Sequence, residues 1–199
     1  MNHMSKLHQH RLQHRMGSMV TIGIVVLLIG LTVLNYWRQP REYEAKLIAK
    51  DLTMLADVFA RIDKRCRIME FDGQINTINF LNVKSFNGSE VGPMNLAYPT
   101  QWQGPYLTEH PKIQDKDYQI VKTRHGYFIT PGNGVTLPNG KVIGKDIILD
   151  ENADIAAMLN DEKMLKYKDT PLAVSLPLVT STVQRLIMEN VADTEEDMV

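Results

Sequence analysis

An uncharged, apolar run from Ser18 to Trp37 limits what the rest of the chain can fold into. A helix rises about 1.5 Å per residue, so a run of this length spans about 30 Å, the thickness of the hydrocarbon core of a bilayer. Lipid offers no partner to a free backbone amide, which requires a helix at that depth. Tyr36 and Trp37 end the run with rings that favour a membrane–water boundary. The sequence therefore predicts one transmembrane helix over residues 18–37.

Two glycines lie within this run. Gly23 and Gly30 are seven residues apart and so fall on one side of a helix. Because small residues allow two membrane helices to approach closely, we expect Gly23 and Gly30 to be contacts for helix packing and assembly.

The segment before the run, residues 1–17, is a basic, His-rich leader without an acidic residue. Its basic residues favour a cytoplasmic N-terminus and an extracytoplasmic C-terminal domain, although Arg38 and Arg41 on the far side reduce the contrast. His3, His8, His10 and His14 allow either a metal-binding tract or a polar tail, and the lack of carboxylates and cysteines favours the tail. No small residues suited to signal peptidase follow the run, so it is predicted to remain as an anchor.

The composition excludes several classes of function. A net charge of -1 leaves no excess of Lys and Arg for nucleic acid, which is therefore not an expected partner. The single cysteine, Cys66, allows no intrachain disulfide. Outside the leader the only histidines are His110 and His125, and no hydrolase, metalloprotease or Cys-x-x-Cys motif is present. The sequence predicts no catalytic residue and no enzyme.

Residues 38–71 are predicted to continue the helix as an amphipathic segment, bent at Pro40. Apolar residues recur at alternating steps of four and three, typical of one buried helical stripe. This core stripe contains Ile48, Leu52, Leu55, Phe59, Ile62, Cys66 and, at its end, Met69. Cys66 is thus interpreted as a core residue and not as a nucleophile. The opposite, solvated face is assigned Lys50, Asp51, Asp57, Arg61, Asp63 and Lys64.

Residues 72–179 are predicted to form an extracytoplasmic α+β domain. A short strand is expected over residues 75–83, followed by a loop over 91–111. Two hairpins are expected next, 118–122 with 127–130 and 135–137 with 141–143. These strands predict an antiparallel meander with one face packed on the long helix.

A second helix is predicted over residues 150–167 with Asp150 as its N-cap, and residues 180–199 are predicted to form a terminal helix and an acidic tail. Four acidic residues lie around the start of the second helix: Asp146, Asp150, Glu151 and Asp154. Hard oxygen ligands of this kind can hold calcium, the only cofactor the sequence raises. The alternative is the ordinary enrichment of acids at a helix N-terminus.

The order of leader, apolar helix, bend, amphipathic helix and meander resembles type IV pilins and the pseudopilins of type II secretion systems. The stretch Gly104-Pro105-Tyr106-Leu107 is similar to one that precedes the meander in many major-pseudopilin-like chains. The resemblance implies cleavage by a prepilin peptidase between Gly17 and Ser18. It also implies a bacterial inner-membrane location, a periplasmic or extracellular domain, and membrane lipid and other pilin or pseudopilin subunits as partners in a filament used for protein transport.

The chain departs from this family at Ile22, where a glutamate usually follows the cleavage site by five residues. Such a departure suits a minor or initiating subunit. The alternative is a bitopic membrane protein with an extracytoplasmic binding or scaffold domain that never polymerises. A mature chain that begins at Ser18 favours the filament subunit, and an intact Met1 favours the alternative.

Overall fold

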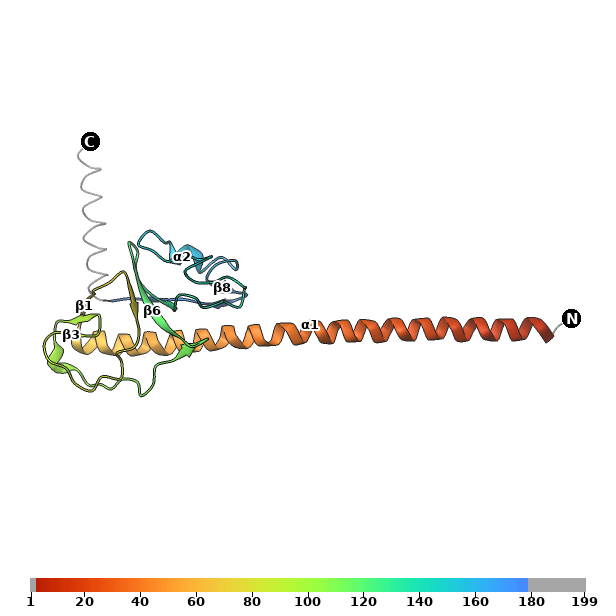
Figure 1. Ribbon diagram of the computed structural model, residues 1–199, viewed down its shortest axis with the longest axis horizontal. Helices are drawn as coiled ribbons and strands as arrows, with labels where there is room; N and C mark the ends of the chain where they lie inside the picture. The colour runs from red at the N-terminus through yellow and green to blue at the C-terminus, as the bar shows by residue number, and fades with distance from the viewer. Residues whose placement is uncertain (1–2, 179–199) are drawn as a thin grey trace, which may run out of the picture. The chain divides into compact units, whose positions relative to one another are not determined.

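The computed structural model describes the backbone of residues 3–178, and the side chains of residues 24–30 and 40–178. The chain divides into two units, Met1–Tyr43 and Glu44–Val199. Helix α1, His3–Cys66, contains Pro40 in its interior and contributes to both units (Figure 1). The second unit combines helix with antiparallel sheets, which confirms the predicted α+β class.

The described elements after α1 are short strands, one 3-10 helix and one short α-helix. The first half contains β1 Ile68–Phe71, β2 Ile75–Thr77, β3 Glu90–Val91, β4 Met94–Leu96, η1 Pro99–Gln101 and β5 Lys112–Ile113. The second half contains β6 Lys116–Thr123, β7 Gly126–Pro131, α2 Ile155–Met158, β8 Lys166–Tyr167, β9 Thr170–Pro171 and β10 Val174–Leu176.

The largest sheet is built on the hairpin of β6 and β7, with Ile120 opposite Ile129. Its strand order is β10-β7-β6-β2, and β5 pairs with β6 beyond this path. The alternating β-formers and the intervening Gly126 predicted this hairpin, which the structure confirms. Both faces of the hairpin are buried, so the sheet is an internal layer of the second unit.

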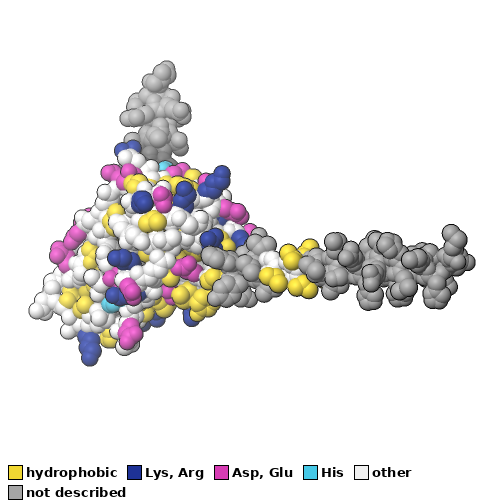
Figure 2. Space-filling view, turned by 45° about the vertical axis from the view of Figure 1, so that its right-hand side comes forward, with side chains coloured by type: hydrophobic (Ala, Val, Ile, Leu, Met, Phe, Trp, Pro, Cys, Tyr) yellow, Lys and Arg dark blue, Asp and Glu magenta, His cyan; other side chains and the backbone are white. Residues whose placement is uncertain are grey.

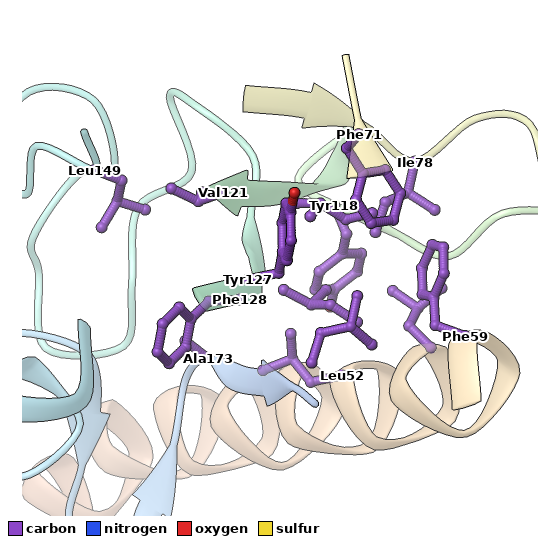
Figure 3. Packing of buried hydrophobic residues seen from close by; sticks show 14 of the residues in the cluster. Leu52, Phe59, Phe71, Ile78, Tyr118, Val121, Tyr127, Phe128, Leu149 and Ala173 are labelled. Atoms are coloured by element: carbon purple, nitrogen blue, oxygen red, sulfur yellow. The ribbon is translucent and has the colours of Figure 1, made fainter. Parts of the chain in front are cut away.

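One face of the sheet packs on α1 and the other is covered by the chain between β7 and β10. Figure 3 shows Tyr118 between the sheet and α1, where Leu52 and Phe59 lie on the helix, and the Tyr127 ring makes an edge contact with Phe71 at a centroid distance of 5.3 Å. The covering layer supplies a second set of buried side chains: Val135, Leu137, Ile143, Ile147, Leu149, Ile155 and Leu165. The sheet is therefore held between a helix and a layer of mostly irregular chain.

The stripe on α1 lies in the centre of this core. Ile48, Leu52, Leu55, Phe59, Ile62 and Cys66 are each at most 2% exposed. The Phe59 ring makes edge contacts with Phe71 and Phe80, at centroid distances of 6.0 and 6.2 Å. Edge-to-face contacts of this kind add to the stability that area burial provides.

Helix α1 ends earlier than its apolar spacing predicted. Arg67 adopts the left-handed conformation with φ 54°, which stops the helix after Cys66. Met69 is consequently on β1 and 44% exposed, so its assignment to the stripe was wrong. Asp63 was wrongly placed on the solvated face, because it is 7% exposed and its Oδ1 accepts a hydrogen bond from the Ile68 amide at 2.8 Å.

The prediction of a four-stranded antiparallel meander was also wrong. Residues 135–137 and 141–143 are joined only by an isolated bridge between Thr136 and Val142, and the chain turns directly before and after each of these three-residue runs. The outer strands of the sheet are β2 and β10, which lie far apart in sequence. The segment 91–111 was predicted as a loop, but it contains β4, which forms a small sheet in the order β1-β4-β3.

The second helix is much shorter than predicted. Asp154, not Asp150, is the N-cap of α2, and its side chain accepts a hydrogen bond from the Ala157 amide. The segment after α2 turns instead of continuing, and Lys166–Tyr167 pairs with Thr170–Pro171. The prediction for residues 180–199 lies outside the described part of the chain.

Replacing Phe59 with Asp tests the packing of α1 on the sheet. Burial of an unpaired charge costs several kcal/mol, a large part of the total stability of a small domain. We expect Phe59→Asp to remove the cooperative thermal transition in circular dichroism. Ala60→Asp introduces the same charge at the next, exposed position of α1 and should change the melting temperature little. An unchanged melting temperature for Phe59→Asp would contradict the packing described here.

Candidate assembly surface

The first unit presents a run of apolar side chains to solvent. Ile24, Val25, Val26, Leu27, Leu28 and Ile29 are between 48% and 63% exposed. Consecutive helical residues point in all directions around the axis, so this part of α1 is apolar on every side. Figure 2 shows the run as a yellow band along the helix. Contiguous apolar surface of this kind is typical of contact with lipid or with another apolar segment.

The structure describes only some of the residues on which the predictions of glycine-mediated helix packing and of leader cleavage depend. A Cβ atom added to Gly30 would meet no heavy atom within 4 Å, so this side of the helix is open. Gly17, Ser18 and Gly23 fall within the backbone span of α1, but their side-chain surroundings lie outside the described residues. Within the part of the chain whose side chains are described, no helix is both long and apolar enough to cross a membrane.

In the second unit, α1 has an outer face that no other described element covers. We define the outer face as the residues lining a shallow open depression along the helix. These are Ala49, Lys50, Thr53, Met54, Asp57, Ala60, Arg61 and Lys64. Most of them are exposed, whereas the stripe residues between them in sequence are buried. One side of the helix therefore holds the domain together while the other side remains accessible.

Residues 104–107, which are similar to the pseudopilin stretch, lie at the C-terminal end of the stripe. The Tyr106 and Leu107 amides both donate to the Leu81 carbonyl, at 2.9 and 3.1 Å. The Trp102 indole donates to the Val83 carbonyl at 3.1 Å and stacks edge-on against Tyr106. We call residues 102–107 the strap, because hydrogen bonds attach this segment to the chain at residues 81–83.

Burial raises the pKa of the Cys66 thiol, and the adjacent Tyr106 hydroxyl and Arg65 oppose the shift. Burial also raises the pKa of the Tyr106 hydroxyl. The thiolate, the nucleophilic form of cysteine, is therefore disfavoured. Cys66 is 0% exposed, so its position matches that of a core residue.

The sequence did not predict a polar contact that lies in the seam between α1 and the sheet. The fully buried Tyr118 donates its hydroxyl to Asp51 Oδ2 at 3.0 Å, and burial raises the pKa of Asp51. Asp51 was placed on the solvated face but is only partly exposed. Asp51 directly precedes Leu52 and so lies at the edge of the stripe, a position from which its partial burial could have been predicted.

The proposed calcium ligands do not converge. Each of three carboxylates accepts a backbone hydrogen bond close to it in sequence: Asp146 from Val142, Asp150 from Asn152 and Asp154 from Ala157. Among the residues with described side chains, no three His, Cys, Asp or Glu come together to hold a metal ion. Asp146 and Asp150 therefore take part in local turns, Asp154 caps α2, and the calcium prediction for Asp146, Asp150, Glu151 and Asp154 is not supported.

The four histidines of the leader lie outside the residues whose side chains are described. Of the two remaining histidines, His110 accepts a hydrogen bond from the Leu81 amide through Nε2 at 2.9 Å. His125 lies in the turn between β6 and β7, where its amide donates to Thr123. Both histidines thus take part in local structure.

Comparisons with protein families, curated proteins and solved structures find no match to this chain.

The contact of His110 with the Leu81 amide predicts a loss of stability in mild acid. Burial lowers the pKa of His110 from its ordinary value of 6.5. Below pH 6.5 His110 is therefore more protonated in the unfolded chain than in the folded chain, so the free energy of unfolding falls as the pH decreases. We expect urea denaturation of the wild type to show this fall between neutral pH and the lowered pKa.

His110→Gln is the matched variant, because a Gln side-chain oxygen can accept from Leu81 without titrating. The difference in unfolding free energy between wild type and His110→Gln should depend on pH in this window. The comparison also cancels the opposite contribution of Asp51, whose raised pKa favours the folded state as the pH falls. A difference that stays constant with pH would contradict the prediction.

The close surroundings of Gly104 predict that the strap has no room for a side chain at this position. A Cβ atom at this position would collide with the Val83 carbonyl and the Trp102 indole. We expect Gly104→Ala to lower the free energy of unfolding by about 1–3 kcal/mol, as overpacking typically does. Gln103→Ala alters the exposed neighbouring residue and should have little effect. Equal stability of the two variants in urea denaturation would rule out the close approach.

Proposed function

We propose that the chain is a structural, pilin-like or pseudopilin-like subunit of a type IV pilus or type II secretion filament. The apolar part of α1 would hold the chain in the bacterial inner membrane before assembly. The supporting observation is the exposed run from Ile24 to Ile29, which is apolar around the whole helix. Such a segment is stable only in lipid or against other apolar helices.

Assembly in this proposal exchanges one apolar environment for another. Lipid chains and neighbouring helices are equally apolar, so a segment without charge loses little when it leaves the bilayer for a bundle of subunits. The open side at Gly30 suits such packing, because nothing stands in the way of a neighbouring helix there. The membrane, and then other copies or related subunits, would be the partners.

The same helix would carry the outer domain into the filament. The buried stripe from Ile48 to Cys66 makes the C-terminal part of α1 the central element of the α+β unit. The apolar segment and this unit belong to one covalent chain, so a subunit that assembles through its apolar segment would bring its domain with it.

Mass spectrometry of the native N-terminus tests the proposal. We expect a mature chain that begins at Ser18, and we expect Gly17→Asp to leave the leader attached, because the cut would follow the glycine. Gln9→Ala changes the leader away from the junction and should be processed normally. An intact Met1 in the wild-type chain would instead favour the bitopic protein with a non-polymerising scaffold domain.

A further inference from the structure

The second unit contains three pairs in which an asparagine directly precedes a glycine: Asn87-Gly88, Asn133-Gly134 and Asn139-Gly140. Such a pair can lose its side-chain amide spontaneously, because the backbone nitrogen of the glycine can attack the asparagine carboxamide when no Cβ atom hinders its approach. The reaction requires a carboxamide and a following N–H group that are both free to move. The sequence makes the three pairs equivalent in this respect, whereas their surroundings in the fold differ.

The pair at Asn139 is held at both reacting groups. Asn139 Nδ2 donates to three backbone carbonyls of the segment 162–166, at distances of 2.8 to 3.4 Å. Asn139 Oδ1 accepts a hydrogen bond from the Lys141 amide at 3.1 Å. The Gly140 amide donates to the Leu137 carbonyl at 2.8 Å. Groups engaged in this way can react only after a local opening of the structure.

The pair at Asn133 is held at the attacking nitrogen. Asn133 and Gly134 are both exposed, so exposure alone would allow this pair to react. The Gly134 amide, however, donates to the Ile143 carbonyl at 2.8 Å. Asn133 Oδ1 also lies close to Gly144, at 3.0 Å from the position that a Cβ atom would occupy there. Deamidation at Asn133 therefore also requires a hydrogen bond to open first.

The pair at Asn87 is held at neither group. Asn87 and Gly88 lie in an exposed bend that leads into β3. In the part of the chain that the structure describes, neither the Asn87 side chain nor the Gly88 amide makes a hydrogen bond. A Cβ atom at Gly88 would meet no heavy atom within 4 Å, so the surroundings of this pair are open. Both reacting groups are thus free to approach one another.

We propose that Asn87 is a site of spontaneous deamidation and that the fold protects Asn133 and Asn139. The Gly88 nitrogen loses its proton to solvent and attacks Asn87 Cγ, so that a new N–Cγ bond closes a succinimide ring. The Cγ–Nδ2 bond breaks, and the nitrogen takes up the proton and leaves as ammonia. Water then opens the ring at either carbonyl, giving aspartate or isoaspartate. The net reaction converts a carboxamide and a water molecule into a carboxylic acid and ammonia.

The product changes the charge and the backbone directly before β3. Either acid adds a negative charge to the loop that precedes the exposed Glu90. In isoaspartate the main chain passes through the former side chain and is longer by a methylene group. The Ser89 carbonyl, which follows this lengthened link, accepts a hydrogen bond from the Leu96 amide of β4 at 2.9 Å. We therefore expect deamidation at Asn87 to loosen the contact between the start of β3 and β4.

Ageing of the full-length protein in detergent micelles at mildly alkaline pH tests the proposal. Peptide mass spectrometry measures the fraction of acid at each of the three asparagines over time. Asn87 should convert about tenfold faster than Asn133 and Asn139, a ratio that corresponds to the cost of opening a protein hydrogen bond. Its rate should rise with pH, because the attacking nitrogen must lose a proton. Equal rates at the three sites in the folded protein would overturn the proposal.

The same measurement in concentrated urea separates the effect of the fold from that of the sequence. Unfolding releases all three pairs, so their rates should become comparable. If Asn87 kept its full advantage in urea, local sequence would explain the difference and protection by the fold would be ruled out.

Asn87→Gln is the matched variant, because it keeps the amide but would have to close a larger and less favourable ring. Aged Asn87→Gln should contain no acid at residue 87, while Asn133 and Asn139 convert as in the wild type. Hydrogen exchange at the Leu96 amide should be faster in the aged wild type than in the aged variant. Acid formation in Asn87→Gln at the wild-type rate would exclude the succinimide route, and equal exchange at Leu96 would contradict the loosening of β3.

Discussion

The second unit depends on the burial of one side of α1 against the sheet. The six stripe residues are almost completely removed from solvent, and the rings of Phe59, Phe71 and Phe80 meet at the end of the seam. The strands are short, and strands of two to eight residues have little stability without a surface to cover. The helix supplies that surface, so loss of the seam would affect every other element of the domain.

Polar groups at the edges of the seam fix its geometry. Asp51 accepts from Tyr118 of β6, and Asp63 accepts from the Ile68 amide where the chain leaves the helix. At the start of the unit, Gln114 donates to Glu44 of α1 and also binds the Thr136 backbone. Buried polar groups require partners, so the contacts of Asp51 and Asp63 restrict how the helix and the sheet can be combined, while the exposed contacts of Gln114 connect α1 to the covering layer.

The burial of one side of α1 determines what its other side can do. A helix has room on its circumference for a buried stripe and an exposed face, and here the exposed face consists of charged and small residues. In the first unit the same helix is apolar on every side between Ile24 and Ile29. The described parts of α1 therefore differ in character, since residues 24–29 are apolar on all sides and residues 48–66 have one buried and one exposed side.

The sequence by itself determined the features that depend on local periodicity. The spacing of the stripe identified six buried residues, and the β-formers around Gly126 identified the central hairpin, because both patterns arise from the repeat of a single element. Tertiary structure decided the pairing of β2 and β10 with that hairpin, the burial of Asp51 and Asp63, and the separation of the four carboxylates near α2. These features join residues distant in sequence or depend on a left-handed turn at Arg67, and no repeat in the chain encodes them. The same periodicity predicted the solvated face of α1, and the structure confirms it for Lys50, Asp57, Arg61 and Lys64, which are all exposed.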